Sequence, residues 1–332
     1  MTFGTCAPRV AVRTLKVMDG PRVSIVVPLF EKAAYVERAI ASILAQRSRS
    51  FEVIVVDDGS TDGGADLIAG GQRVRVVRQE NAGPGAARNR GIAEARGEYI
   101  AFLDADDVWE PDYLEYAVGA LDAHPEVAAV TSGWRLDPGA IDVRSMWKRR
   151  GVRDGIIRMN AQTPAPRAVA LLAYMHPCAT TVRAQAIRAL GGFYDRDRCR
   201  YGEDSFLFLQ LLLREPILIS LAPRVRIDTG ASALSTRRLP REIEPLYEGA
   251  AQLETACPPA LLPLLRDILA IRAGKTACVM TYWGRNADAR RLVREFTQPE
   301  QLRYRWVALG RLAATPLGPW ASAIARYARS AQ

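Results

Sequence analysis

The sequence predicts an α/β domain built on a largely parallel β-sheet. Short apolar, β-branched runs alternate with helical patterns over residues 21–130, as expected when crossover helices join parallel strands. Polar residues also gather directly after three of these runs. Ligands of such sheets bind beyond the carboxyl ends of the strands, so the three clusters point to a site there. Solvated loop acids explain one such cluster well and three poorly.

The predicted elements alternate in order from residue 23. The run VSIVVPLF predicts a first buried strand, and apolar residues at steps of three and four then predict a helix. The run FEVIVV predicts a second strand, and the same reasoning assigns the later runs. The predicted strands cover residues 23–30, 51–56, 73–77 and 99–103, and the predicted helices cover residues 35–46 and 86–95.

The pattern is looser in the second half of the chain. Few apolar runs and several Gly and Arg residues over 135–165 suggest a mobile excursion. Residues 168–190 are expected to be helical around a short strand at 178–182, and residues 205–214 to form a buried helix. Helical stretches separated by prolines follow Pro240, so we place a domain boundary there.

The composition is that of a globular protein. The 332 residues are 49% hydrophobic and 24% charged, which argues against collagen, coiled-coil and disordered chains. No apolar run approaches the roughly 18 residues of a membrane-spanning helix, and no signal-peptide core stands at the N-terminus. The five cysteines form no CxxC pair, which fits a reducing compartment better than a disulfide framework. We expect a cytoplasmic protein, soluble or peripheral to the inner face of the membrane.

The net charge of +9 is concentrated at the two ends of the chain. Residues 283–332 hold nine arginines against three acidic residues, and residues 1–20 are also basic, so the body is nearly neutral. This distribution argues against a nucleic-acid footprint. One helical face among the C-terminal arginines carries Leu302, Trp306, Leu309 and Ala313. Such a basic amphipathic helix either lies on an anionic membrane or packs on the catalytic domain or a second subunit.

Two pairs of acidic residues stand where predicted strands end. Asp57 and Asp58 enter the hydroxyl-rich turn DDGSTD, which can hydrogen-bond a ribose or base and is equally a good turn. Asp104 and Asp106 are two residues apart, which in extended geometry places both carboxylates on one face. Such a pair repels unless a cation lies between, and Mg²⁺ or Mn²⁺ prefers these oxygen ligands. A divalent ion there would neutralise a departing nucleoside diphosphate.

Two helix starts also carry candidate residues. Small residues in the stretch NAGPGAARN let a backbone or ligand approach closely, and a helix N-terminus favours anions. Arg88 in that stretch either contacts a phosphate or base or forms an ordinary surface salt bridge. Glu203 and Asp204 begin the later apolar helix, where the pattern fits both a catalytic base and a helix cap.

Taken together, these stretches resemble the inverting glycosyltransferases of family 2, which have the GT-A fold. The resemblance is carried by residues 23–46, 51–64, 81–115 and 191–213, and it covers about residues 21–230. It implies a Rossmann-like, mostly parallel sheet flanked by helices, followed by a C-terminal helical region.

The resemblance also implies a division of the chain. A basic N-terminal extension at 1–20 would precede a catalytic domain at 21–240, and helices would cover 241–332. Within the catalytic domain, residues 21–130 would bind the nucleotide-sugar and residues 131–240 the acceptor.

The resemblance assigns roles to individual residues. The implied nucleotide-sugar contacts are Pro28, Phe30, Glu31, Asp57, Asp58, Asn81, Arg88, Asp104 and Ala105. The implied ligands of Mn²⁺ or Mg²⁺ are Asp104, Asp106 and Asp228. Glu203 and Asp204 match the family's acceptor-side acids, and we expect Asp204 to be the catalytic base.

The sequence departs from the family pattern at two places. Phe30-Glu31 stands where Tyr-Asn is usual, which keeps the aromatic ring and loses its hydroxyl. Asp228 stands where a histidine near the metal or diphosphate is common, so this loop has either an oxygen ligand or no metal role. His176 either faces the acceptor or has a structural role.

We therefore expect a metal-dependent, inverting enzyme that moves a sugar from a nucleoside diphosphate donor, a UDP-sugar, to a hydroxyl of a glycan or lipid-linked acceptor. Cell-surface polysaccharide synthesis is the expected setting. A sugar nucleotidyltransferase is an alternative, but VSIVVPLFEK lacks its glycine-rich signature. A non-catalytic carbohydrate-binding relative is another, and the presence of Asp104, Asp106 and Asp204 argues against it.

Overall fold

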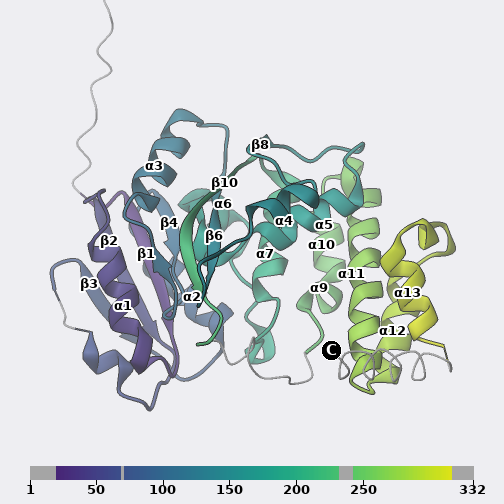
Figure 1. Cartoon of the computed structure of the whole chain (residues 1–332), viewed down its shortest axis with the longest axis horizontal. Coiled ribbons are helices and arrows are strands. Elements are labelled where there is room, and N and C mark those ends of the chain that lie inside the picture. The colour runs from purple at the N-terminus through teal and green to yellow at the C-terminus, as the bar shows by residue number, and fades with distance from the viewer. Residues whose placement is uncertain (1–19, 69–70, 232–241, 316–332) are drawn as a thin grey trace, which may run out of the picture.

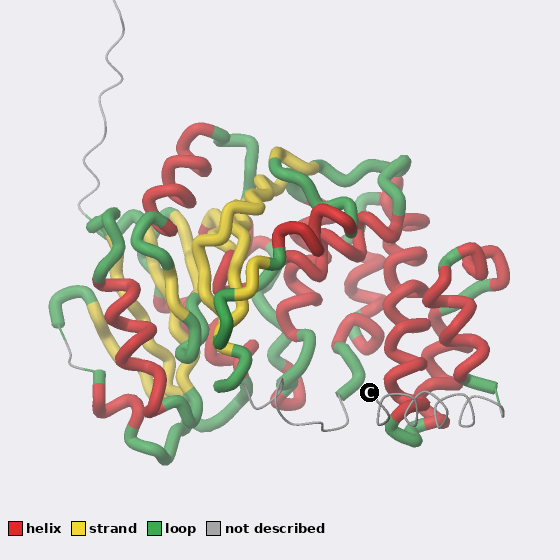
Figure 2. Tube along the Cα trace, in the orientation of Figure 1, coloured by secondary structure: helices red, strands yellow, loops and turns green. Residues whose placement is uncertain are grey.

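The computed structural model of the protein describes residues 20–68, 71–231 and 242–315. It confirms the predicted fold class, because one large sheet is flanked by helices and a group of C-terminal helices stands at one end (Figure 1). Figure 2 shows that all strands belong to the half that contains the sheet, while the other end is helical. The predicted extension at 1–20 lies outside the described residues, apart from Gly20.

The described strands and helices follow the predicted order up to residue 102. The strands are β1 Val23–Leu29, β2 Phe51–Asp57, β3 Val74–Arg78, β4 Tyr99–Phe102, β5 Val108–Trp109, β6 Ala129–Asp137, β7 Ile141–Asp142, β8 Gly155–Ile157, β9 Thr180–Arg183 and β10 Ile217–Asp228. The helices are α1 Ala33–Leu44, α2 Pro84–Glu94, α3 Tyr113–Ala123, α4 Arg144–Arg149, α5 Ala165–Tyr174, α6 Ala184–Ala189, α7 Glu203–Arg214, α9 Pro245–Glu248, α10 Ala250–Ala256, α11 Leu262–Tyr282, α12 Asn286–Phe296 and α13 Arg305–Ala313. Short 3-10 turns are η1 Gly64–Leu67, η2 Pro177–Ala179, η3 Arg196–Arg198, η4 Pro259–Leu261 and η5 Pro299–Arg303.

The sheet has a parallel half and a mixed half. Its order is β3-β2-β1-β4-β9-β6-β10-β5, with β7 beside β6 and β8 beside β10. The strands β3, β2, β1 and β4 are parallel, because α1 and α2 carry the chain back between them. The strand β9 is antiparallel to both β4 and β6. The carboxyl ends of β1, β2 and β4 therefore meet at one edge, where the three predicted polar clusters begin.

The structure corrects the expectation for the second half of the chain. The stretch 135–165, expected to be an excursion, carries β7, α4 and β8 and contributes Trp147 to the core. The Trp147 ring lies 5.8 Å from Trp134 and 5.4 Å from Tyr174, between ring centroids. The strand β10 was not predicted as a strand. Its pairing with β6 shifts register on both sides of Pro223, so the alternation that marks a strand is interrupted.

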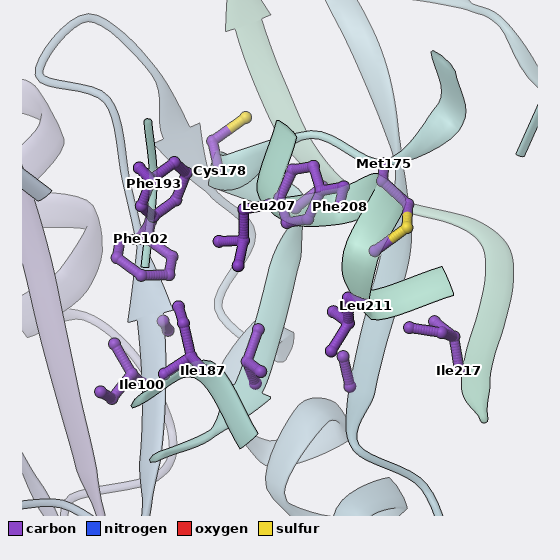
Figure 3. Close-up of a cluster of buried hydrophobic side chains, with 14 of the residues drawn as sticks. Ile100, Phe102, Met175, Cys178, Ile187, Phe193, Leu207, Phe208, Leu211 and Ile217 are labelled. Atoms are coloured by element: carbon purple, nitrogen blue, oxygen red, sulfur yellow. The ribbon is translucent and has the colours of Figure 1, made fainter. Parts of the chain in front are cut away.

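Buried apolar side chains fix α7 against the sheet. Figure 3 shows Leu207, Phe208 and Leu211 of α7 in the core beside side chains of the sheet. Phe102 at the end of β4 packs edge-to-face on Phe193, with ring centroids 5.1 Å apart. Because α7 is apolar nearly all round, its position is set by burial, and its first residues are brought to the carboxyl end of β4.

The C-terminal helices continue the main core and also enclose a second, smaller one between α11 and α12. Residues of α11 such as Leu264 and Leu265 belong to the same buried cluster as the sheet. The helices α11 and α13 approach closely at Gly274, where an added Cβ would lie 2.2 Å from the Trp306 carbonyl oxygen. Among the described residues no helix is both long and apolar enough to span a bilayer.

The predicted apolar face around α13 is only partly covered by the described residues. Val307 and Gly310 are buried in the direction of α11. By contrast Leu302, Trp306 and Leu309 are 48%, 40% and 36% exposed. The helix α13 therefore packs on α11 through one side, as one alternative expected, and leaves these three side chains exposed. Arg326 and Arg329 lie outside the described residues.

Candidate active site

The loops after β1, β2 and β4 are bonded to one another at one edge of the sheet. The Asp58 backbone N–H donates to the Leu29 carbonyl at 2.8 Å. The Thr61 backbone N–H and hydroxyl both donate to Glu31 Oε1, at 2.8 and 3.0 Å. The Lys32 ammonium donates to Asp106 Oδ2 at 2.7 Å. The tertiary structure thus brings the three predicted clusters together.

Arg88 links the donor-side acids to the acceptor-side acids. Its guanidinium donates to Asp104 Oδ1 at 2.7 Å and to Glu203 Oε1 at 2.8 Å. The Arg88 side chain is only 5% exposed and lies over the Phe193 ring. Burial opposes its charge, but the two carboxylates outweigh burial and raise the pKa of Arg88. The alternative of an ordinary surface salt bridge is wrong, because this pairing is buried and connects α2, β4 and α7.

The Asp204 carboxylate is the acidic group of this cluster without an ion-pair partner in the described part of the chain. Its Oδ1 accepts a hydrogen bond from the Ser205 backbone N–H at 2.7 Å. Burial raises the pKa of Asp204, although the positive charge of Arg88 opposes the shift. A helix N-terminus lowers the pKa of a carboxyl beside it, and burial by the surrounding protein outweighs that effect here. A carboxylate with a raised pKa suits proton transfer near neutral pH.

The two acids after β2 are engaged within the protein. Asp58 Oδ1 accepts from Gln79 Nε2 at 2.8 Å and from the Ala82 N–H at 2.9 Å, and its Oδ2 accepts from the Gly83 N–H at 2.9 Å. Asp57 Oδ1 accepts from the Ser60 N–H at 2.9 Å. Asp58 therefore holds the loop before α2 in shape, and its predicted contact with a base or ribose stays a prediction.

The small residues that begin α2 serve close packing within the protein. A Cβ at Gly85 would lie 2.1 Å from the Tyr194 carbonyl oxygen. A Cβ at Gly83 would lie 3.1 Å from the Cys199 carbonyl oxygen. The segment around 194–199 therefore covers this end of α2. The Asp58 carboxylate already accepts hydrogen bonds from the Ala82 and Gly83 N–H groups just before the helix. Packing within the protein explains these glycines, and the expectation that they admit a ligand stays a prediction.

The other predicted nucleotide contacts surround the same edge. Phe30 is 47% exposed, so its ring is free to stack on a base. Pro28 is half-buried in β1, and Ala105 is buried. The Asn81 side-chain amide donates to the Asp58 carbonyl at 3.1 Å.

The three predicted metal ligands pair with three different cations. Arg88 binds Asp104, Lys32 binds Asp106, and Arg38 donates to Asp228 Oδ2 at 2.8 Å. Over residues 20–68, 71–231 and 242–315, no three His, Cys, Asp or Glu side chains form a group that could hold a metal ion. Asp228 is held by Arg38, and the expectation that Asp104, Asp106 and Asp228 form one ligand set stays a prediction.

A divalent metal fits the chemistry of the remaining pair. Burial and the charge of Asp104 raise the pKa of Asp106, and the Lys32 ammonium only partly offsets them. A buried carboxylate beside a second carboxylate is stabilised more by a divalent cation than by one ammonium. The oxygen ligands of Asp104 and Asp106 are those that Mg²⁺ and Mn²⁺ prefer. Binding at Asp106 would require Lys32 to leave it.

Lys32 and Arg38 are further residues of the site that were not predicted. Lys32 directly precedes α1 and Arg38 lies in its second turn, where charge alone gave no signal. His176 lies within electrostatic range of Asp104, Arg88 and Glu203, and burial lowers its pKa. Its Nδ1 lies 3.4 Å from Cys178 Sγ. The sequence had singled out His176 as a residue that either faces the acceptor or has a structural role, and it favoured the structural role.

Residues 24–176 match the model of the family described as glycosyl transferase family 2. These residues therefore form a family 2 glycosyltransferase domain. This membership argues against the sugar nucleotidyltransferase considered from the sequence.

Curated relatives are similar to part of this chain. The succinoglycan biosynthesis protein ExoO of Rhizobium meliloti is 43% identical over 129 residues, which are 38% of this chain and 36% of ExoO. The putative teichuronic acid biosynthesis glycosyltransferase TuaG of Bacillus subtilis is 41% identical over 100 residues, 29% of this chain and 40% of TuaG. The chain thus spans well under half the length of these curated relatives.

The fold similarity to a solved structure extends into the C-terminal helices. The crystal structure of Staphylococcus aureus TarS 1–349 in complex with UDP-GlcNAc superposes with a TM-score of 0.65 at 19% identity. The superposition covers 91% of this chain and 87% of that one. It confirms the GT-A fold.

Proposed function

We propose that this chain is an inverting glycosyltransferase that moves a sugar from a UDP-sugar donor to a hydroxyl of a glycan or lipid-linked acceptor in polysaccharide synthesis. The observation that carries the proposal is the buried bridge of Arg88 between Asp104 and Glu203, beside the unpaired Asp204. It joins a donor-side acid to an acceptor-side pair in one cluster. The named relatives act in polysaccharide biosynthesis, and the structural neighbour was crystallised with UDP-GlcNAc, which supports the donor and the setting.

In this proposal the reaction is a single displacement. Asp204 accepts the proton of the acceptor hydroxyl as that oxygen attacks the anomeric carbon. The carbon–oxygen bond to the diphosphate breaks on the opposite face, and its electron pair leaves with UDP. One displacement of this kind inverts the anomeric centre. Arg88 fixes Glu203, the neighbour of Asp204, and thereby sets the direction in which the base faces.

We include a divalent metal, Mn²⁺ or Mg²⁺, in the proposed function. Asp106 would hold it, with Asp104 beside it. When bound, the metal would neutralise charge on the diphosphate. Asp228 has no metal role in this proposal, because Arg38 and the backbone N–H groups of Gly230 and Ala231 occupy its carboxylate. The domain division at 21–240 and 241–332 also stays a proposal.

A panel of sugar nucleotides tests this function directly. With Mn²⁺ present, we expect one UDP-sugar to raise the melting temperature by several degrees, because ligands that bind only the folded state stabilise it. The same donor should release UDP in a coupled assay, faster when glycan acceptors are added. The panel should include GDP- and dTDP-sugars as controls for the base. If no nucleoside diphosphate sugar stabilises the protein with metal present, the proposed function is wrong.

We also propose that the exposed face of α13 contacts an anionic membrane surface, where lipid-linked acceptors are found. The face consists of Trp306 and Leu309 of α13 and of Leu302 in the preceding turn η5, and the exposed Arg303 and Arg305 flank it. Apolar side chains among arginines match the interfacial zone of an anionic bilayer.

Vesicle co-sedimentation tests the membrane contact. We expect binding to vesicles that contain phosphatidylglycerol and little binding to phosphatidylcholine alone. Trp306→Glu with Leu309→Glu should abolish the binding. The matched control is Leu44→Glu with Leu67→Glu, two exposed apolar residues in the sheet-containing half, and it should bind as the wild type does. If the α13 variant instead converts a dimer to a monomer without affecting vesicles, the face is a subunit interface.

A further inference from the structure

The Lys32 ammonium occupies a defined cation position at the candidate active site. Its Nζ lies 2.7 Å from Asp106 Oδ2 and 2.6 Å from the Ala231 carbonyl oxygen. The Tyr35 ring adds a cation–π contact, with Nζ 5.6 Å from its centroid. The Lys32 and Asp106 side chains are 21% and 12% exposed, so the pair is largely shielded from water. Lys32 therefore satisfies the carboxylate that the proposed metal would need.

Three chain segments meet at this ammonium. Lys32 stands directly before α1, Asp106 follows β4, and Ala231 follows β10. The neighbouring Arg38 binds the same two segments, because it donates to the Asp106 carbonyl and to Asp228 Oδ2, both at 2.8 Å. Arg38 contacts the backbone of Asp106, whereas Lys32 contacts its carboxylate. Of these two side chains, Lys32 is the one that competes for the Asp106 carboxylate oxygen that would bind a metal.

We propose that Lys32 is an exchangeable counter-ion that occupies Asp106 until a divalent metal replaces it, and that the exchange also releases the Ala231 carbonyl. This inference rests on the proposed metal-dependent function. A divalent ion replaces a single charge at a shielded carboxylate, so it is favoured once it is available with a diphosphate. The lysine side chain is long and flexible, and its ammonium can move without displacing the backbone. Metal binding would thereby loosen the contact between the loops that follow β4 and β10.

The exchange makes a prediction about metal affinity that needs no catalysis. Lys32→Met removes the competing charge, so we expect the variant to bind Mn²⁺ about tenfold more tightly than the wild type without nucleotide. The electron paramagnetic resonance signal of free Mn²⁺ measures this affinity directly. Lys32→Gln is a second variant with the same expectation if the methionine variant folds poorly. Circular dichroism checks that each variant is folded.

Two controls separate this inference from the proposed function. Arg38→Met removes a neighbouring positive charge but leaves the Lys32–Asp106 pair in place, and we expect its Mn²⁺ affinity to change less than threefold. Asp106→Asn should lose Mn²⁺ binding. If the wild type and both Lys32 variants bind Mn²⁺ equally, the exchange is overturned while the metal site stands. If none of them binds Mn²⁺ even with UDP, the metal part of the proposed function fails and the exchange fails with it.

Discussion

Asp204→Asn is expected to lower the rate of sugar transfer by about 10³-fold. The rate is measured as UDP release, with an acceptor or with water taking the sugar. The asparagine keeps the shape and the hydrogen bond from the Ser205 N–H but cannot take up a proton. Donor binding should persist, because Asp204 pairs with no donor-side residue in the described chain. We therefore expect the same increase in melting temperature with UDP and Mn²⁺ as in the wild type.

A matched control stands at the C-terminal end of the same helix. Glu215→Gln makes the same change of charge just beyond the far end of α7, and we expect wild-type turnover. The pH profile adds a second readout. Because burial raises the pKa of Asp204, activity should fall as the pH drops through that raised pKa, at a higher pH than an ordinary aspartate would give. Unchanged turnover in Asp204→Asn would move the base to Glu203 or elsewhere.

Arg88→Met is expected to cost about 3–5 kcal/mol of unfolding free energy, because it leaves two carboxylates near a buried cluster without their cation. Asp104 and Glu203 would then lie in the same shielded region with no guanidinium between them. Urea unfolding measures the loss. Adding Glu203→Gln should restore part of it, since one unpaired charge is removed. Activity should fall as well, because Glu203 would no longer be held beside Asp204.

The control for Arg88 is an arginine with the same number of acidic partners at the surface. Arg22 pairs with Glu98 and Asp122 but is 35% exposed, so Arg22→Met should cost less than about 1 kcal/mol. Equal losses of unfolding free energy in the two variants would show that the buried bridge contributes no more to stability than the surface ion pairs of Arg22.

The pH dependence of Arg88→Met follows from the same bridge. In the wild type, Arg88 holds the pKa of Asp104 below its ordinary value despite burial. That contribution to stability is present above the unfolded pKa of an aspartate and is lost as the pH falls through the lowered value. In the variant the carboxylates of Asp104 and Glu203 would ionise less readily. The loss of unfolding free energy relative to the wild type should therefore be largest near neutral pH and shrink as the pH approaches about 5.

The sequence allowed the parallel half of the sheet and its polar edge to be predicted. Continuous apolar runs such as residues 23–30 and 51–56 are buried on both faces, and that pattern depends on local residues only. The prediction was weaker where strands are irregular. The strand β10 pairs with β6 across two shifts of register, and no local pattern shows where such shifts fall.

For the candidate site, the sequence identified the types of residue but not which side chains pair with which. The acids after β2 and β4 and at the start of α7 could be identified because they interrupt apolar runs. Nothing local indicated that Asp58 would hold the α2 loop, or that Arg38 would pair with Asp228. These partners are up to 190 residues apart in the chain, so only packing brings them together.

By itself the sequence determined the α/β class, the polar edge of the sheet and the resemblance to family 2, because burial periodicity and motif order are local properties. Tertiary structure alone decided which charge meets which. It placed Arg88 between Asp104 and Glu203, left Asp204 without a cation, and put the Lys32 ammonium on Asp106. The physical reason is that an ion pair depends on distance and burial, and both are set only when β4, α1, α2 and α7 pack on one sheet.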